Sequence, residues 1–290
     1  MLSRRHAVLS LAATVAAGAT PESFRLAVCS ETFPGLAFPE LCGAARRTGY
    51  TGLEIDASQL GPDPSKLSSE QCALYRRQME DAGLSFVGFH SFLKAPPGLH
   101  LTMPDVEARR KSWDLFARLI EICARLGSSP LMVLGSGKQR SGNGLRHIEE
   151  GLARVAPIAA KHGVTILLEP LSPQFTDNVN TIAQALAMVR QIDSPGLRTM
   201  LDVHNLVAES ESPAALAAKY IHDIRHIHLN EMDGRYPGSG DYAFAPFLQA
   251  LRDNQYSGWL SMELFDFLPD GESVARRSLK FIRQIERSLV

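Results

Sequence analysis

Eight short β-rich segments alternate with longer amphipathic segments along the chain, and this repeat constrains the fold more than any other feature. The predicted strands are the apolar runs at 24–31, 51–57, 84–90, 130–136, 164–170, 197–204, 224–231 and 258–264. Between them, and after the last one, lie predicted helices at 38–49, 68–83, 106–127, 144–163, 180–192, 244–255 and 273–290. Eight β/α units in a chain of 290 residues predict an α/β fold, a single (β/α)8 TIM barrel.

The first 19 residues do not follow this repeat and predict a cleaved export signal. They begin with Arg4 and Arg5, continue with small apolar residues, and end in an Ala-Gly-Ala cleavage pattern at 17–19. The Ser-Arg-Arg sequence resembles the twin-arginine signal of bacteria. We therefore expect a periplasmic or otherwise exported protein with no stable membrane anchor after cleavage, and a barrel at 20–290. The alternative is a disordered or weakly membrane-bound N-terminus.

The charge balance favours a small-molecule partner over a nucleic acid. Without Arg4 and Arg5, 28 basic residues stand against 31 acidic residues, which gives a net charge of −3. Such a balance lacks the basic footprint that is typical of nucleic-acid binding, so we expect no nucleic-acid partner. The sequence carries no readable signal for an assembly surface, and a homo-oligomer is compatible with it.

Four potential metal ligands occur near the carboxyl ends of four successive predicted strands. They are Glu169, Asp202, His228 and Glu263, and the intervals between them are 33, 26 and 35 residues, each about one β/α unit. The carboxyl ends of barrel strands meet in one bowl, so we expect the four side chains to converge. Two glutamates, an aspartate and an imidazole form an oxygen-rich site suited to Mn²⁺ or Mg²⁺, with Co²⁺, Fe²⁺ or Zn²⁺ as alternatives.

The same segments carry a resemblance to a known family. The Glu-Pro pair at 169–170, the Asp-x-His run at 202–204, the His-x-His run at 226–228, PGSG at 237–240 and YSGWLSMEL at 256–264 resemble the sugar phosphate isomerase/epimerase family. These are xylose-isomerase-like TIM barrels that include ketose 3-epimerases, inosose dehydratases and hydroxypyruvate isomerases. The resemblance covers essentially the whole mature chain. It implies that Glu169, Asp202, His228 and Glu263 hold the metal, and that Glu169 and Glu263 also exchange protons with the substrate.

The implied site suits proton transfer next to a carbonyl group. A metal bound by the carbonyl and hydroxyl oxygens of an α-hydroxy ketone stabilises the enediolate, and two carboxylates on opposite faces can remove and return the proton. We therefore predict a divalent-metal-dependent isomerase or epimerase that acts on a sugar, keto-sugar or related polyol. If a β-substituent leaves, the same chemistry gives a metal-dependent lyase acting on a keto-sugar or keto-glycoside.

Two further alternatives are less favoured by the sequence. An endonuclease-IV-like hydrolase would need a trinuclear zinc site with additional histidines, whereas the predicted strand at 130–136 ends in Leu-Gly-Ser-Gly without one. A noncatalytic sugar-binding protein would not require the complete set of four ligands. The sequence therefore favours an enzyme with a carbohydrate substrate.

Other polar residues near predicted strand ends are candidate substrate-binding groups. His204 lies two residues after Asp202, whereas many relatives place a substrate-contacting histidine three residues after that aspartate, where this chain has Asn205. His226 is expected to lie deeper than His228 and to support it. The complete predicted set of substrate-binding residues is Glu54, His90, His204, Asn205, Glu231 and Arg235.

Two positions depart from the resemblance to ketose epimerases. Phe175 stands where those enzymes carry a second glutamate, six residues beyond the metal-binding one. Gly234 stands where they carry a substrate-binding arginine, with Arg235 beside it. These departures argue against a simple epimerase of free ketohexoses.

Overall fold

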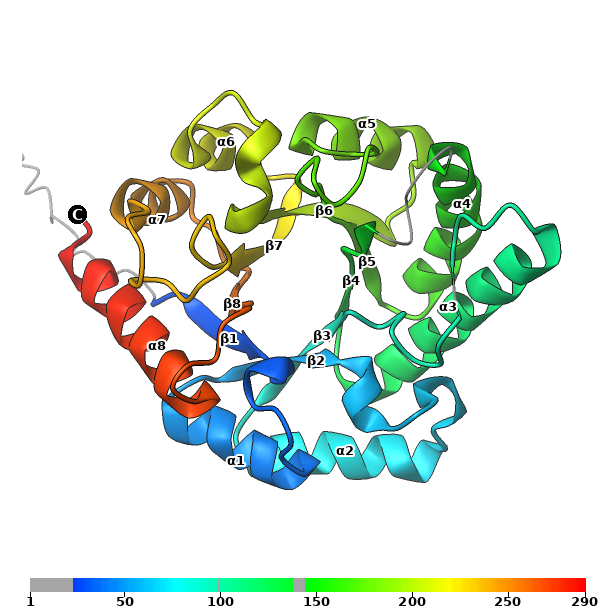
Figure 1. Ribbon diagram of the computed structural model, residues 1–290, viewed down its shortest axis with the longest axis horizontal. Coiled ribbons are helices and arrows are strands. Elements are labelled where there is room, and N and C mark those ends of the chain that lie inside the picture. Colours follow the sequence, from blue (N-terminus) through cyan, green and yellow to red (C-terminus); the bar gives the residue numbers. More distant parts are fainter. Residues whose placement is uncertain (1–22, 99, 138–143) are drawn as a thin grey trace, which may run out of the picture.

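The computed structural model describes residues 23–98, 100–137 and 144–290, and in these residues eight parallel strands close into a barrel (Figure 1). Each strand pairs with the next in the sequence, and β1 pairs with β8 to close the ring. The predicted TIM barrel is thus confirmed. The predicted export signal lies outside the described residues. The strands are β1 Arg25–Cys29, β2 Gly52–Asp56, β3 Ser85–His90, β4 Leu131–Leu134, β5 Thr165–Leu168, β6 Leu197–Asp202, β7 Ile224–Leu229 and β8 Trp259–Met262.

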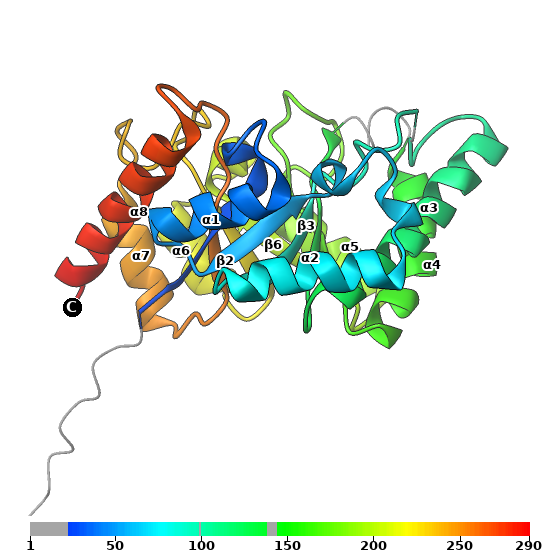
Figure 2. The same cartoon turned by 90° about the horizontal axis from the view of Figure 1, so that it is seen from below.

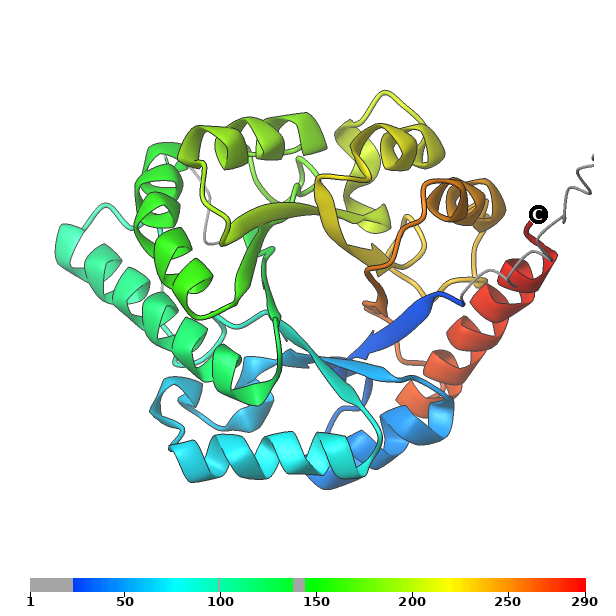
Figure 3. The same ribbon diagram turned by 180° about the vertical axis from the view of Figure 1, so that it is seen from behind.

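Helices form a ring around the strands, as the view from behind also shows (Figure 3). In the side view, α8 lies on the opposite side of the barrel from α3 and α4 (Figure 2). None of the helices in the described part of the chain has the length and apolar content needed to cross a membrane. The helices are α1 Phe38–Thr48, α2 Ser69–Asp81, α3 Val106–Leu126, α4 Leu145–Lys161, α5 Ile182–Ile192, α6 Pro213–Tyr220, α7 Phe244–Asp253 and α8 Gly271–Ser288.

Helix α6 completes the repeat between β6 and β7, where the sequence pattern predicted no helix. It is only 8 residues long, which is too short for a clear amphipathic period. Its start nevertheless has a local signature. The Ser212 hydroxyl accepts a hydrogen bond from the Ala215 N–H at 3.2 Å, and Pro213 occupies the first turn.

Contacts between α8 and the first β/α unit hold the two ends of the barrel together. The Phe24 N–H, just before β1, donates to Glu286 Oε1 of α8 at 2.6 Å. The Tyr50 hydroxyl, before β2, donates to the Ala275 carbonyl oxygen at 2.8 Å. Both contacts are buried and join residues more than 200 positions apart, so closure depends on the last helix as well as on the pairing of β1 with β8.

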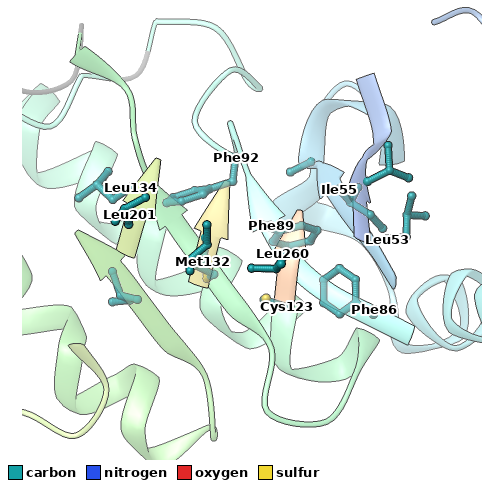
Figure 4. Close-up of a cluster of buried hydrophobic side chains, with 14 of the residues drawn as sticks. Leu53, Ile55, Phe86, Phe89, Phe92, Cys123, Met132, Leu134, Leu201 and Leu260 are labelled. Carbon is teal, nitrogen blue, oxygen red and sulfur yellow. The ribbon is translucent and has the colours of Figure 1, made fainter. Parts of the chain in front are cut away.

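Successive residues of each strand face opposite sides, and this alternation separates the apolar core from the polar interior. Leu53 and Ile55 of β2 belong to the buried apolar layer, part of which is shown in Figure 4. Between them, Glu54 reaches His226 of β7 at 2.7 Å. Because β1 and β8 lie between β2 and β7 in the sheet, this contact crosses the barrel interior. The barrel interior therefore holds these charged groups together with a small apolar cluster of Val133, Leu167 and Met200, and the main apolar layer lies between sheet and helices.

Candidate functional site

The structure brings together the four predicted ligands at the carboxyl ends of β5 to β8. Glu169 directly follows β5, Asp202 ends β6, and Glu263 directly follows β8. His228 lies in β7 and pairs in register with Asp202. Each of the four residues offers a ligand atom, and these atoms all lie within 4.8 Å of one another. Their common position at or near the carboxyl ends of adjacent strands thus converts the spacing in the sequence into a single cluster.

The two ring nitrogens of His228 contact two different carboxylates. Nδ1 lies 3.0 Å from Glu263 Oε2, and Nε2 lies 3.1 Å from Glu54 Oε1. Burial lowers the pKa of His228, but the negative charges of Glu263 and Glu54 outweigh it and hold this pKa well above its usual value. A metal-binding histidine commonly donates its second N–H to a carboxylate, and Glu54 meets that requirement. His228 Nδ1 is then the nitrogen on the side of the other ligands.

Glu54 supports the site from below. It lies in the middle of β2, not at its end, and is only 1% exposed. Its second oxygen lies 2.7 Å from His226 Nε2. Burial raises the pKa of Glu54, yet His226 and His228 together bring it well below its usual value. Both oxygens of Glu54 contact imidazoles, which indicates a supporting role, and its predicted substrate contact stays a prediction.

Asn205 connects two of the ligands through its side-chain amide. Its Nδ2 donates to Asp202 Oδ2 at 2.6 Å and lies 3.2 Å from Glu169 Oε1. Its Oδ1 accepts from the Ser172 N–H at 2.9 Å. The residue is 5% exposed. Asn205 therefore orients two carboxylates, and its predicted substrate contact stays a prediction.

The donor set fits a hard divalent cation. Burial, and then the charge of Glu263, raise the pKa of Asp202 above its usual value. Three carboxylates within one buried cluster repel each other, and a divalent ion between them would remove that cost. Carboxylate oxygens with one imidazole nitrogen suit Mn²⁺ or Mg²⁺. Glu169, Asp202, His228 and Glu263 are thus the residues that could hold a metal.

A cavity of about 490 Å³ opens next to this cluster, on the side of β3 and β4. Gly135, after β4, leaves room for the Glu169 carboxylate, since a Cβ there would lie 1.8 Å from Glu169 Oε2. The cavity is therefore wide enough for a sugar-sized molecule and in contact with two of the ligands. Its polar lining consists of His90, Ser91, Lys94, Ser136, Glu169 and Glu263.

His90 lies in this cavity as the sequence predicts. Its Nε2 lies 2.6 Å from Glu31 Oε2, and its Nδ1 lies 3.4 Å from Glu263 Oε1. Lys94, in the loop after β3, places Nζ 2.7 Å from Asp56 Oδ2 at the end of β2. Glu31 was not predicted as a site residue, although it is the last residue of the predicted strand at 24–31. The four ligands were predicted from the same kind of position at a strand end.

Glu231 and Arg235 organise the loop between β7 and α7 and do not reach the cluster. The two oxygens of Glu231 accept hydrogen bonds from the Gly238 N–H at 2.8 Å and the Tyr242 N–H at 3.1 Å. Arg235 pairs with Asp233, with Nε 2.7 Å from Oδ2, and 44% of its side chain is exposed. Unpaired N–H groups of a tight loop need acceptors, and Glu231 supplies them. In this structure both side chains hold the loop, and their expected substrate contacts stay predictions.

His204 lies at the rim of the site between two phenylalanines. Its backbone N–H donates to Asp202 Oδ1 at 3.1 Å, and its Nδ1 donates to the Met232 carbonyl oxygen at 2.8 Å. The ring centroid lies 5.7 Å from that of Phe175 and 5.3 Å from that of Phe265. Phe265 was not expected from the sequence, because a phenylalanine after a strand is normally assigned to the core.

Comparison with known proteins agrees with this architecture. A family model for the xylose isomerase-like TIM barrel matches residues 42–285. The chain is 26% identical over 264 residues to a probable ketose 3-epimerase of Synechocystis sp., covering 83% of this chain and 88% of that protein. It is 24% identical over 193 residues to the 3-dehydro-D-guloside 4-epimerase of Escherichia coli, covering 61% of this chain and 72% of that protein.

Solved structures share the fold at low sequence identity. L-ribulose 3-epimerase has a TM-score of 0.77 at 20% identity, covering 92% of this chain and 95% of that chain. The 3-keto-D-glucoside 4-epimerase of E. coli has a TM-score of 0.77 at 19% identity, covering 90% of this chain and 100% of that chain. The family model and the closed barrel together show that the chain belongs to the xylose isomerase-like TIM barrel family.

Proposed function

We propose that this protein is a divalent-metal-dependent epimerase or isomerase that moves a proton at a carbon next to the carbonyl group of a keto-sugar or related polyol. The observation that carries the proposal is the position of Glu169 and Glu263, which belong to the four-ligand cluster and also line the cavity. The family relatives named above are epimerases of ketoses and of a keto-glycoside, which supports a sugar substrate.

The two glutamates approach the cavity from separate strands. Glu169 follows β5 and Glu263 follows β8, with β6 and β7 between them in the sheet. A trigonal carbon held between the two carboxylates has one on each face, so one can remove a proton and the other can return it. When bound, a divalent ion would polarise the carbonyl group and stabilise negative charge on the substrate oxygens.

Neighbouring residues hold these carboxylates in position. Asn205 lies 3.2 Å from Glu169 Oε1, and His228 and His90 lie 3.0 Å and 3.4 Å from the oxygens of Glu263. His90 and Lys94 also line the cavity, where they can bind substrate hydroxyl groups. Orientation of both proton-transfer groups therefore relies on several strands at once.

Elimination from a keto-glycoside is the second candidate function. One relative acts, by its name, on a 3-dehydro-D-guloside. In such a compound, loss of the proton next to the ketone can expel a β-substituent, which leaves with the electron pair of the broken bond. We also propose that the protein acts after export through a twin-arginine-type signal at 1–19, which would bring it to extracytoplasmic glycosides.

The proposal is tested by hydrogen exchange in D₂O with the purified mature chain loaded with Mn²⁺. The substrates are ketoses, 3-keto-glycosides and inososes, followed by NMR. We expect deuterium at a carbon next to the carbonyl group, and its loss after chelation. The product then separates epimerisation, isomerisation and elimination. An epimerised or isomerised product without deuterium at that position would contradict proton exchange with the two glutamates, whereas an eliminated product is identified by its lost β-substituent.

A further inference from the structure

Three aromatic rings form a row at the rim of the site: Phe175, His204 and Phe265, called here the aromatic row. The His204 ring lies between the two phenylalanines, at centroid distances of 5.7 Å and 5.3 Å. Phe175 is 47% exposed and Phe265 is 56% exposed. The three residues come from three different loops, after β5, β6 and β8. Two large apolar rings are thus presented together beside a cluster of charged ligands.

The backbone fixes Phe265 beside the site. Phe265 follows the ligand Glu263 by two residues, and its N–H donates to the Gly234 carbonyl oxygen at 3.1 Å. Gly234 has a φ of +83°, and a Cβ there would lie 2.4 Å from the Phe265 ring. Glycine at 234 therefore permits the ring to lie over this turn. The position of Phe265 is specified by its surroundings.

Phe175 is fixed through the residues that orient the ligands. Its N–H donates to the Ser172 carbonyl oxygen at 2.9 Å, and the Ser172 N–H donates to Asn205 Oδ1 at 2.9 Å. The Ser172 hydroxyl donates to the His204 carbonyl oxygen at 3.2 Å. Since Asn205 also contacts Glu169 and Asp202, the aromatic row and the ligand cluster share one hydrogen-bond network.

The aromatic row is distinct from the polar cavity, although the Phe175 backbone lies beside Gly137, which follows the cavity residue Ser136. Among the described residues that line the cavity, none belongs to the aromatic row. The cavity offers His90 and Lys94 to hydroxyl groups, whereas His204 Nδ1 is already bonded to the Met232 carbonyl oxygen. One part of the site thus suits a sugar, and the adjoining part suits an apolar group.

Building on the proposed function, we propose that the aromatic row binds an apolar, planar aglycone attached to a keto-sugar, so that the substrate class is aryl keto-glycosides. The sugar lies against the ligands and the polar cavity, and its aglycone extends over Phe175 and Phe265. Aromatic stacking and the burial of exposed apolar surface stabilise such a complex. An aglycone attached to the bound sugar would lie beside both the aromatic row and the ligands. This also explains why one hydrogen-bond network joins the row to the ligand cluster.

The test compares two probes that differ only in the aglycone, phenyl 3-keto-β-D-glucoside and methyl 3-keto-β-D-glucoside. Their dissociation constants are measured by calorimetry with the Mn²⁺-loaded protein, and deuterium exchange is measured in parallel. We expect the phenyl compound to bind about tenfold more tightly, the size of one favourable aromatic contact. In the double variant Phe175→Ala/Phe265→Ala, the affinity ratio falls to about one.

Two further variants serve as controls. Phe175→Tyr/Phe265→Tyr keeps both rings and should retain most of the preference for the phenyl compound. Leu74→Ala removes a 46% exposed apolar side chain on α2 and should leave the ratio unchanged. Because both phenylalanines are about half exposed, the alanine variants are expected to fold, which circular dichroism checks.

The outcomes separate this inference from the proposed function. A phenyl preference that depends on the row, without deuterium exchange, would support the subsite and contradict the enediolate proposal. Exchange with equal affinity for both probes, or a preference that survives in the double alanine variant, would overturn the subsite alone. A change of molar mass in the double alanine variant, with an unchanged affinity ratio, would identify the row as a subunit contact and also overturn it.

Discussion

The two halves of the barrel contribute to the site in different ways. β5 to β8 supply the four clustered ligands, all at or near the carboxyl ends of the strands. β1 to β4 and their loops supply supporting groups, such as Glu54 below His228 and Glu31 beside His90. The ligand half follows the register of adjacent strands, whereas the supporting half acts through contacts across the barrel interior. The ligands thus come from one half of the chain, whereas their orientation depends on residues of both halves, since Asn205 after β6 also contacts Glu169 and Asp202.

The largest expected effect belongs to the ligand half. Glu169→Gln and Glu263→Gln should each leave the fold intact and reduce turnover by about a thousandfold, within the range for loss of a general acid or base. The measurement is the rate of deuterium exchange, with circular dichroism as the check on folding. Near-normal turnover with both glutamates replaced would show that these carboxylates do not transfer the proton.

A smaller effect is expected in the supporting half. Glu54→Gln removes the negative charge beside His226 and His228. Loss of such a supporting carboxylate typically lowers metal affinity or activity about 10- to 100-fold. Calorimetric titration with Mn²⁺ measures the affinity directly. If Glu54 were a substrate contact instead, the variant would raise KM and leave Mn²⁺ affinity unchanged, which would remove the distinction between the two halves.

Glu231 should affect stability more than chemistry. Glu231→Ala leaves the N–H groups of Gly238 and Tyr242 without their acceptors. Glu231 is buried and hydrogen bonds to a charged group contribute about 1.5–3 kcal/mol, so the free energy of unfolding should fall by about 2 kcal/mol. Urea unfolding followed by circular dichroism measures this change. Unchanged stability together with a lost substrate affinity would instead assign Glu231 to the binding site.

The smallest effect is expected at Arg235, on the same loop. Its guanidinium pairs with Asp233 on the surface, where ion pairs contribute about 0–1 kcal/mol. Arg235→Ala should therefore change exchange rates less than about twofold, because the side chain does not reach the ligand cluster. A large rise in KM would restore the substrate contact that its position in the sequence suggested. The variant also serves as the matched control for Glu231→Ala.

The sequence predicted the fold and the ligand cluster because both depend on regular spacing. Eight repeats specify the barrel, and one β/α unit between ligands places Glu169, Asp202, His228 and Glu263 in a single bowl. The short helix α6 was not predicted, because about two helical turns are too few to show a clear amphipathic period. The export signal stays a prediction, because it lies outside the described residues.

The role of each supporting residue could not be predicted from spacing. Glu54 contacts His226 across the barrel, and 172 positions separate them in the sequence. Glu231 lies two residues beyond the end of β7 and Glu169 directly follows β5, yet the oxygens of Glu231 accept hydrogen bonds from loop N–H groups. Whether a strand-end carboxylate faces the bowl or its own loop depends on how the following loop folds. The spacing of the strands along the sequence does not show how that loop folds.

The most direct test of the account is anomalous diffraction at the manganese edge from crystals of the mature protein grown with Mn²⁺. We predict a single strong peak between Glu169, Asp202, His228 and Glu263, with His228 coordinating through Nδ1 and Glu54 bonded to its Nε2. A peak at other residues, or none at this cluster at saturating Mn²⁺, would contradict the assignment of these four residues as the metal centre.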